Sequence, residues 1–169
     1  MFWMSVVEQD LELYHQEGCN VYGVDLSSSM LNVARKKFGE GADLRLCDAA
    51  QLPFQNESFD LILSTYTLHE MIHANRAAVI QEMIRVVKKS GRILLTDFSP
   101  RPYSFPIGWI NRTSILIFET IAGREHFNNG LDFLNRGGIL ELIQPYQLDI
   151  ESATLVGGGT TAFFLLRTY

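Results

Sequence analysis

Cysteine is scarce in this chain of 169 residues, which contains only Cys19 and Cys47. The two thiols have neither the spacing of a metal site nor that of a disulfide framework, so we expect ordinary core side chains in a reducing environment. Residues 1–4 lack the basic region and the long apolar stretch that begin a signal peptide. These absences predict a cytoplasmic protein without disulfide cross-links.

An excess of positive charge is also missing. The chain has 14 lysines and arginines against 19 acidic residues, a net charge of -5, and no basic cluster, which argues against a nucleic-acid backbone as the main partner. With 47% hydrophobic residues, it is long enough for one buried core and too short for two ordinary domains. We therefore expect a single domain over residues 1–169.

Strand and helix patterns alternate along the first hundred residues. Apolar runs predict strands over residues 21–25, 44–48, 59–64 and 92–97. Helical spacing predicts helices over residues 5–17, from the serines at 27–28 to the glycines at 39 and 41, and over 77–87 with Gly91 closing the last. This repeated order predicts an α/β fold, with a Rossmann-like, mostly parallel twisted sheet and helices on both faces.

The last third of the chain follows a different pattern. Residues 100–130 form an insertion rich in bulky apolar residues, and polar residues interrupt it too often for a membrane-spanning helix. A lid, an oligomer contact and a membrane-touching surface are all open interpretations. Gly137 and Gly138 predict a helix break. Residues 147–155, the glycine turn 157–159 and residues 161–168 predict an antiparallel hairpin at the C-terminus.

Asp25 is the most informative single residue, because it follows the apolar run Val21–Val24 and precedes a serine-rich helix start. An acid at the carboxyl end of a buried parallel strand points into the crevice where open α/β sheets bind ligands. A carboxylate there accepts hydrogen bonds from both hydroxyls of a ribose, which indicates a nucleoside-type cofactor. The alternative is that Asp25 only caps the following helix.

An ordered set of motifs supports the first interpretation. It comprises Gly23-Val24-Asp25-Leu26-Ser27 with Met30, Cys47-Asp48-Ala49 before Leu52-Pro53-Phe54, Phe59-Asp60 before Leu68-His69-Glu70, and Arg85-Val86-Val87-Lys88 before Gly91-Arg92. Over roughly residues 15–99, the chain resembles the class I S-adenosylmethionine-dependent methyltransferases. The likeness is greatest to the small-molecule type of ubiquinone and menaquinone biosynthesis.

The resemblance implies S-adenosylmethionine as the cofactor and assigns residues to it. Asp25, with Leu26 beside it, would hold the ribose hydroxyls, and Met30 would pack on the adenine. Asp48 and Ala49 would read the exocyclic amine of the adenine. Ser64 and Thr65 would lie beside the cofactor near the reacting methyl group. Asp48 has an alternative role as a turn former.

The chain departs from this family at its start. The family's first strand ends in a glycine-rich turn, but the corresponding residues here are Met4-Ser5-Val6-Val7-Glu8, and β-branched residues resist the positive φ that such a turn often needs. At most residues 1–3 remain for the first strand. Strand edges exposed there would need a cover, so a homodimer is one expectation.

His69 is the candidate catalytic base, with loop packing as its alternative role. Tyr66, Phe98 and Tyr103 are the candidates for lining the acceptor pocket, and His126 is a further candidate for contact with substrate. The chemistry requires no metal, since the sulfonium already activates its methyl group.

The apolar insertion favours a small hydrophobic or aromatic methyl acceptor, and we expect neither nucleic acid nor stable membrane insertion. The main rival is a non-catalytic scaffold of the same fold that binds a partner and has lost the glycine turn. A nicotinamide-dependent oxidoreductase would also use an acid after its second strand, but it requires a glycine fingerprint that this sequence lacks.

Overall fold

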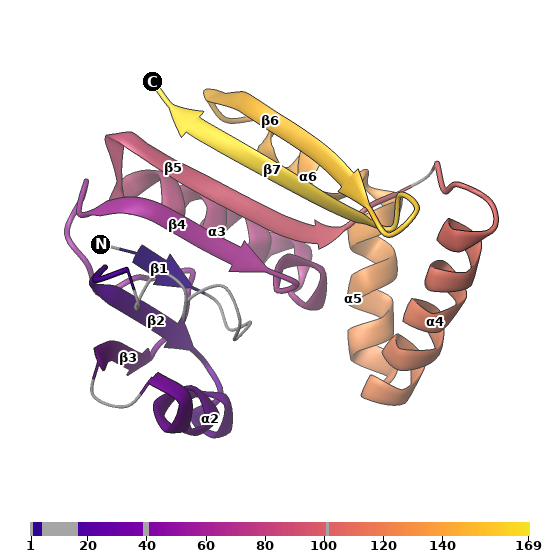
Figure 1. Cartoon of the computed structure of the whole chain (residues 1–169), viewed down its shortest axis with the longest axis horizontal. Coiled ribbons are helices and arrows are strands. Elements are labelled where there is room, and N and C mark those ends of the chain that lie inside the picture. Colours follow the sequence, from indigo (N-terminus) through magenta and orange to yellow (C-terminus); the bar gives the residue numbers. More distant parts are fainter. Residues whose placement is uncertain (1, 5–16, 39–40, 101) are drawn as a thin grey trace.

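The computed structural model describes residues 2–4, 17–38, 41–100 and 102–169, and in them an α/β fold is built on a seven-stranded mixed sheet (Figure 1). Along the chain, the strands are β1 (Phe2–Met4), β2 (Val21–Asp25), β3 (Ala42–Leu46), β4 (Phe59–Thr65), β5 (Val87–Phe98), β6 (Leu148–Val156) and β7 (Thr161–Thr168). Their order across the sheet is β3-β2-β1-β4-β5-β7-β6. The helices are α2 (Ser28–Phe38), η2 (Leu68–Glu70), α3 (His73–Val86), α4 (Ile107–Ala122), α5 (Arg124–Asn135) and α6 (Gly138–Ile143).

Strand pairing changes direction across the sheet. The pairs β1–β2, β2–β3, β1–β4 and β4–β5 are parallel, whereas β5–β7 and β6–β7 are antiparallel. The predicted C-terminal hairpin is therefore confirmed. The short β1 lies between β2 and β4, so the strand order reverses beside it, and ligands of open α/β sheets bind at such a reversal. The glycine-poor residues 5–8 and most of the predicted helix 5–17 lie outside the described residues.

Alternating side chains place a separate apolar cluster on each face of the sheet. On one face, Leu63 packs with Ala34 of α2. On the other face, Ile62 belongs to the larger core, to which α3, α5 and α6 contribute Met83, Phe133 and Ile139 among others. Helices therefore cover both faces in the described part of the chain, and α2 and α3 lie on opposite sides.

The helix before β5 differs from its prediction. It begins at His73, ends at Val86 and is followed directly by β5, so Gly91 does not close it. The β-branched pair of valines 86 and 87 is buried, and the pairing of β4 with β5 jumps from Phe59↔Val87 to Leu61↔Arg92. A Cβ on Gly91 would lie 2.9 Å from the carbonyl oxygen of Asp60. Gly91 therefore permits a close backbone approach within the sheet.

The predicted insertion is a pair of helices. Figure 1 shows α4 and α5 side by side beyond the carboxyl end of β5. Gly123, at φ 124°, separates α4 from α5, and Gly137, at φ 106°, produces the predicted break before α6. No helix in the described ranges has the length and apolarity needed to cross a bilayer.

Candidate functional site

An open cleft of about 610 Å³ lies at the carboxyl ends of β2 and β4. Six of the predicted site residues line it, namely Asp25, Leu26, Met30, Asp48, Ala49 and Tyr66. The other lining residues are Ser27, Cys47, Thr67, Glu70, Met71, Ile72, Asn75, Glu125 and Asn129. One wall is therefore built by strand ends and α2, and the other by η2, α3 and α5.

The Asp25 carboxylate has one oxygen engaged and one available. Its Oδ1 accepts a hydrogen bond of 2.7 Å from the backbone N–H of Ser27, and the Ser27 hydroxyl in turn accepts one of 3.3 Å from the Met30 N–H. These bonds make the turn into α2. Within the described residues, Oδ2 of Asp25 has no hydrogen-bond partner. The capping role and a ligand-binding role are thus compatible.

The loop after β3 is held against the end of β2. The Cys47 N–H donates a 3.1 Å hydrogen bond to the Asp25 carbonyl oxygen. This bond holds the backbone next to Asp48 against the end of β2. Oδ1 of Asp48 accepts a 2.9 Å bond from the Ala50 N–H and shapes the turn at Ala49. Burial raises the pKa of the Cys47 thiol, which keeps it protonated near neutral pH.

Tyr66 follows β4 in a conformation that is uncommon for a non-glycine residue, with φ 50°. Its N–H donates to the Thr96 carbonyl at 2.8 Å, and its hydroxyl lies 2.9 Å from Oγ1 of Thr161 on β7. Backbone strain of this kind clusters at functional sites. Ser64 is buried, and neither it nor Thr65 is among the described residues that line the cleft.

The remaining predicted acceptor residues lie away from the cleft lining. The ring of Phe98 packs against those of both Tyr66 and His69, with centroid distances of 5.3 and 4.3 Å. Tyr103 donates its hydroxyl hydrogen to the Ser99 carbonyl at 3.1 Å and lines a separate groove with Trp109 of α4. His126 of α5 faces acidic side chains, with its Nε2 3.4 Å from Oε1 of Glu70.

His69 is buried, and Asp97 fixes the orientation of its ring. Nδ1 of His69 lies 2.7 Å from Oδ1 of Asp97, while Oδ2 of Asp97 accepts the backbone N–H groups of Leu68 and His69 at 2.9 and 3.2 Å. Burial acts to lower the pKa of His69, but the hydrogen bond and the charge of Asp97, with two nearby glutamates, raise it overall. For the carboxyl group of Glu70, burial has the opposite effect and raises the pKa, although the nearby His126 and His69 act to lower it.

A family model described as a methyltransferase domain matches residues 7–95, which is more than half of the chain. The chain belongs to the class I S-adenosylmethionine-dependent methyltransferases. A curated relative, the ubiquinone/menaquinone biosynthesis C-methyltransferase UbiE of Bordetella avium, is 38% identical over 82 residues, or 47% of this chain and 31% of the relative. The methyltransferase thus spans about a third of the length of the curated relatives that it matches.

Solved structures share the fold of this methyltransferase over nearly its whole length. The PH0226 protein of Pyrococcus horikoshii is similar with a TM-score of 0.71 and 16% identity, covering 99% of this chain and 81% of that one. The 1,6-didemethyltoxoflavin-N1-methyltransferase of Burkholderia thailandensis, solved with S-adenosylhomocysteine, gives a TM-score of 0.68 and 13% identity over 99% of this chain and 70% of that one.

The residues of the methyltransferase fit the cofactor of its family, S-adenosylmethionine. The available Oδ2 of Asp25 lies in a cleft that also holds the thioether of Met30, which is 40% exposed, and the short side chain of Ala49. A carboxylate, an apolar surface and a backbone turn are the three kinds of group that ribose and adenine require.

Several cleft residues of the methyltransferase were not predicted from the sequence. Asn75 comes from α3, and Glu125 and Asn129 come from α5, four positions apart on one helix face. Asn129 also donates from Nδ2 to the Glu70 carbonyl at 2.8 Å. The spacing of Glu125 and Asn129 was a usable signal for a shared face, but the sequence did not indicate which element that face would meet.

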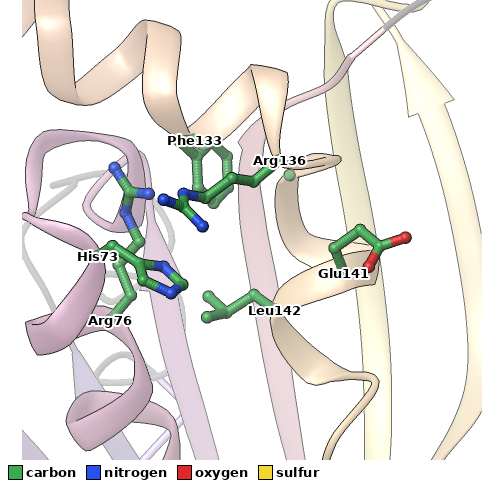
Figure 2. Close-up of a pocket in the computed structure, with 7 residues that line it drawn as sticks. His73, Arg76, Phe133, Arg136, Glu141 and Leu142 are labelled. Atoms are coloured by element: carbon green, nitrogen blue, oxygen red, sulfur yellow. The ribbon is translucent and has the colours of Figure 1, made fainter.

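A separate cavity of about 200 Å³ lies between α3, α5 and α6 (Figure 2). In Figure 2 the guanidinium groups of Arg76 and Arg136 lie beside each other, and both bind Asp132, at 2.7 Å each. Arg76 is buried and also donates to the carbonyl oxygens of Leu68 and Asn129 at 2.9 and 2.7 Å. It therefore joins α3 to η2 and α5, which carry the second wall of the cleft.

Proposed function

We propose that this methyltransferase binds S-adenosylmethionine in the 610 Å³ cleft and transfers the methyl group to a small apolar or aromatic acceptor. The observation that carries the proposal is Oδ2 of Asp25, which has no hydrogen-bond partner within the described ranges and lies near the strand-order reversal, in one cleft with Met30 and Asp48. When bound, the sulfonium of the cofactor supplies a methyl group that is already activated.

The residues of the first wall would each meet a different part of the cofactor. Asp25 would accept hydrogen bonds from the two ribose hydroxyls, and Met30 would pack on the adenine ring. Asp48 and the backbone at Ala49 would recognise the exocyclic amine. The bond from Cys47 to Asp25 keeps these groups together, because it ties the two strand ends that carry them.

The lining of the cleft supports a small acceptor over a polyanion. Four carboxylates, those of Asp25, Asp48, Glu70 and Glu125, line the cleft, and the described lining contains no lysine or arginine. A phosphate backbone would be repelled there. Tyr66, Met71 and Ile72 supply apolar surface, and α4 exposes further large apolar side chains such as Trp109 and Ile110.

The reaction then depends chiefly on alignment and on the exclusion of water. The placement of Ser64 and Thr65 near the reacting methyl group stays a prediction. The same holds for the predicted contacts of Phe98, Tyr103 and His126 with the acceptor. The catalytic role of His69 also stays a prediction, since its imidazole is buried and lies outside the described lining of the cleft.

The test is calorimetric titration with S-adenosylmethionine and S-adenosylhomocysteine, followed by methyl transfer to a panel of acceptors. Because curated relatives are named as ubiquinone/menaquinone C-methyltransferases, quinols and phenols are the first acceptors to try, with transfer RNA as the contrasting class. We expect binding of both ligands and turnover only with the ring compounds. Binding without any turnover would support the non-catalytic scaffold instead, and absence of binding by folded protein would contradict the proposal.

Replacing Asp48 by alanine is expected to weaken S-adenosylmethionine binding about 10-fold, the loss of one charged hydrogen bond. An analogue of S-adenosylmethionine with a carbonyl group in place of the exocyclic amine should bind poorly to the wild-type protein. Its affinity for the Asp48→Ala variant should be no lower than its affinity for wild type. Calorimetry measures both constants. Asp43→Ala is the matched control, since this exposed acid on β3 pairs with Arg45 and does not line the cleft. Equal losses in the two variants would remove Asp48 from the site.

A further inference from the structure

Four side chains that could bind a metal converge where η2 meets α4 and α5. One ligand atom from each of His69, Glu70 and His126 lies within 4.8 Å of the other two. The Glu119 carboxylate of α4 lies between the imidazoles, with Oε1 3.6 Å from Nε2 of His69 and Oε2 3.7 Å from Nε2 of His126. The cluster therefore joins η2 to α4 and α5, which follow much later in the chain.

Asp97 determines which nitrogen atom of His69 is available. A carboxylate only accepts hydrogen bonds, so Nδ1 of His69 must donate its proton to Oδ1 of Asp97. In the neutral imidazole, Nε2 then carries the lone pair and points toward Glu119. Metal-binding histidines commonly have this arrangement, in which the second nitrogen donates to a carboxylate and fixes the ring.

The contacts inside the cluster are spaced as metal ligands are. The distances of 3.6 and 3.7 Å from the imidazoles to Glu119 exceed those of hydrogen bonds. Ligand atoms of a tetrahedral zinc ion, with bonds of about 2.0 to 2.1 Å, lie about 3.3 to 3.4 Å apart. The spacing of 3.4 Å between His126 and Glu70 falls in that range, and the two contacts with Glu119 are slightly larger. The ligand atoms of His69, Glu70 and His126 all lie within 4.8 Å of one another.

Glu119 gives an independent indication of a ligand. Its side chain is only 13% exposed, and its Oε2 is a buried oxygen without a hydrogen-bond partner, the single such side-chain atom found in the described residues. An uncompensated buried carboxylate oxygen is costly. Gly130 leaves room beside it, since a Cβ there would lie 3.2 Å from this oxygen. A cation between Glu119 and the imidazoles would satisfy the oxygen.

We propose that His69, His126 and Glu119, with Glu70 in the fourth position, form a site for a divalent transition-metal ion, with zinc as the best match. Two imidazoles favour zinc over magnesium or calcium, which prefer oxygen ligands alone. The ion fastens α4 and α5 to η2. It also gives His69 a role other than general base, because a nitrogen atom bound to a metal does not take up a proton.

The site goes beyond methyl transfer and is tested without S-adenosylmethionine. Protein freed of metal by a chelator is titrated with Zn²⁺ by calorimetry, with Mg²⁺ as the comparison ion, and bound metal is counted by elemental analysis. We expect one Zn²⁺ per chain, no competition from Mg²⁺ and a higher melting temperature with zinc. Cobalt(II) should give the intense visible absorption of a four-coordinate site. Failure of the folded apoprotein to bind Zn²⁺ would overturn the proposal.

Variants show whether the bound ion is at this cluster. His126→Ala and the nearly isosteric Glu119→Gln are each expected to weaken zinc binding at least about 10-fold, the loss typical of a disturbed site. His73→Ala is the matched control, since His73 is exposed and lines the cavity of Figure 2 instead. Circular dichroism of each apoprotein checks the fold. Unchanged affinity in both cluster variants, or an equal loss in the control, would place the ion elsewhere.

Discussion

Replacing Asp25 by alanine is expected to weaken S-adenosylmethionine binding at least about 100-fold, because two hydrogen bonds to a charged acceptor are lost together. Oδ2 of Asp25 has no hydrogen-bond partner among the described residues, and Asp25 lines the cleft at the end of β2, next to β1, where the strand order reverses. Calorimetric titration of the variant with S-adenosylmethionine and S-adenosylhomocysteine measures the loss. The two ligands should be affected equally, since they share the ribose.

The control must separate the ligand contact from the turn that Asp25 also makes. Asp25→Asn keeps an oxygen that accepts from the Ser27 N–H and therefore keeps the turn into α2, but it removes the charge. We expect this variant to melt like wild type and still to lose most of the affinity. If Asp25→Asn binds both ligands as tightly as wild type, the carboxylate serves the helix start alone.

Replacing Arg76 by methionine is expected to lower the free energy of unfolding by about 3 kcal/mol, because three buried or half-buried partners lose their donor at once. These partners are the carbonyls of Leu68 and Asn129 and the Asp132 carboxylate. Methionine keeps much of the apolar contact with Phe133, over whose ring the guanidinium lies at 5.2 Å. Urea unfolding followed by circular dichroism gives the difference.

Arg136 offers a matched control for Arg76 on the other side of Asp132. It makes the same 2.7 Å ion pair with this residue, but its side chain is 53% exposed, against 1% for Arg76. Arg136→Met is expected to change stability by less than about 1 kcal/mol, as for surface ion pairs. Similar losses in the two variants would mean that the Asp132 pair, rather than the buried backbone carbonyls, carries the effect.

Local patterns were sufficient to predict the strands and the first wall of the cleft. An apolar run that closes on an acid predicts a strand and the edge at which the acid emerges, and this placed Asp25 correctly at the end of β2. The strand predicted over 44–48 is instead β3, Ala42–Leu46, so Asp48 lies in the loop beyond the strand. The Asx-type turn at Ser27 and the helix from 28 follow from the same short segment. A further difference is the end of α3, where Val87 begins a strand four residues before Gly91.

The second wall could not be predicted because it depends on contacts between distant segments. The presence of Glu125 and Asn129 in the cleft depends on how α5 meets η2, a relation set largely by Arg76 from a third element. The proposed metal site could not be predicted for the same reason, since His69, Glu119 and His126 are separated by up to 57 residues, from 69 to 126. No spacing rule covers ligands that only the tertiary fold brings together.

The two walls of the cleft have different consequences for how this molecule can change. Residues that would hold the cofactor are fixed to one another by β2, β3 and the bond between Cys47 and Asp25. The opposite wall includes a helix from the insertion, which is anchored mainly through side chains. If the proposed assignment of the walls holds, substitutions on α4 and α5 reshape the acceptor side while the cofactor side keeps its geometry. Descendants of one ancestral domain could acquire new acceptors without having to rebuild nucleoside recognition.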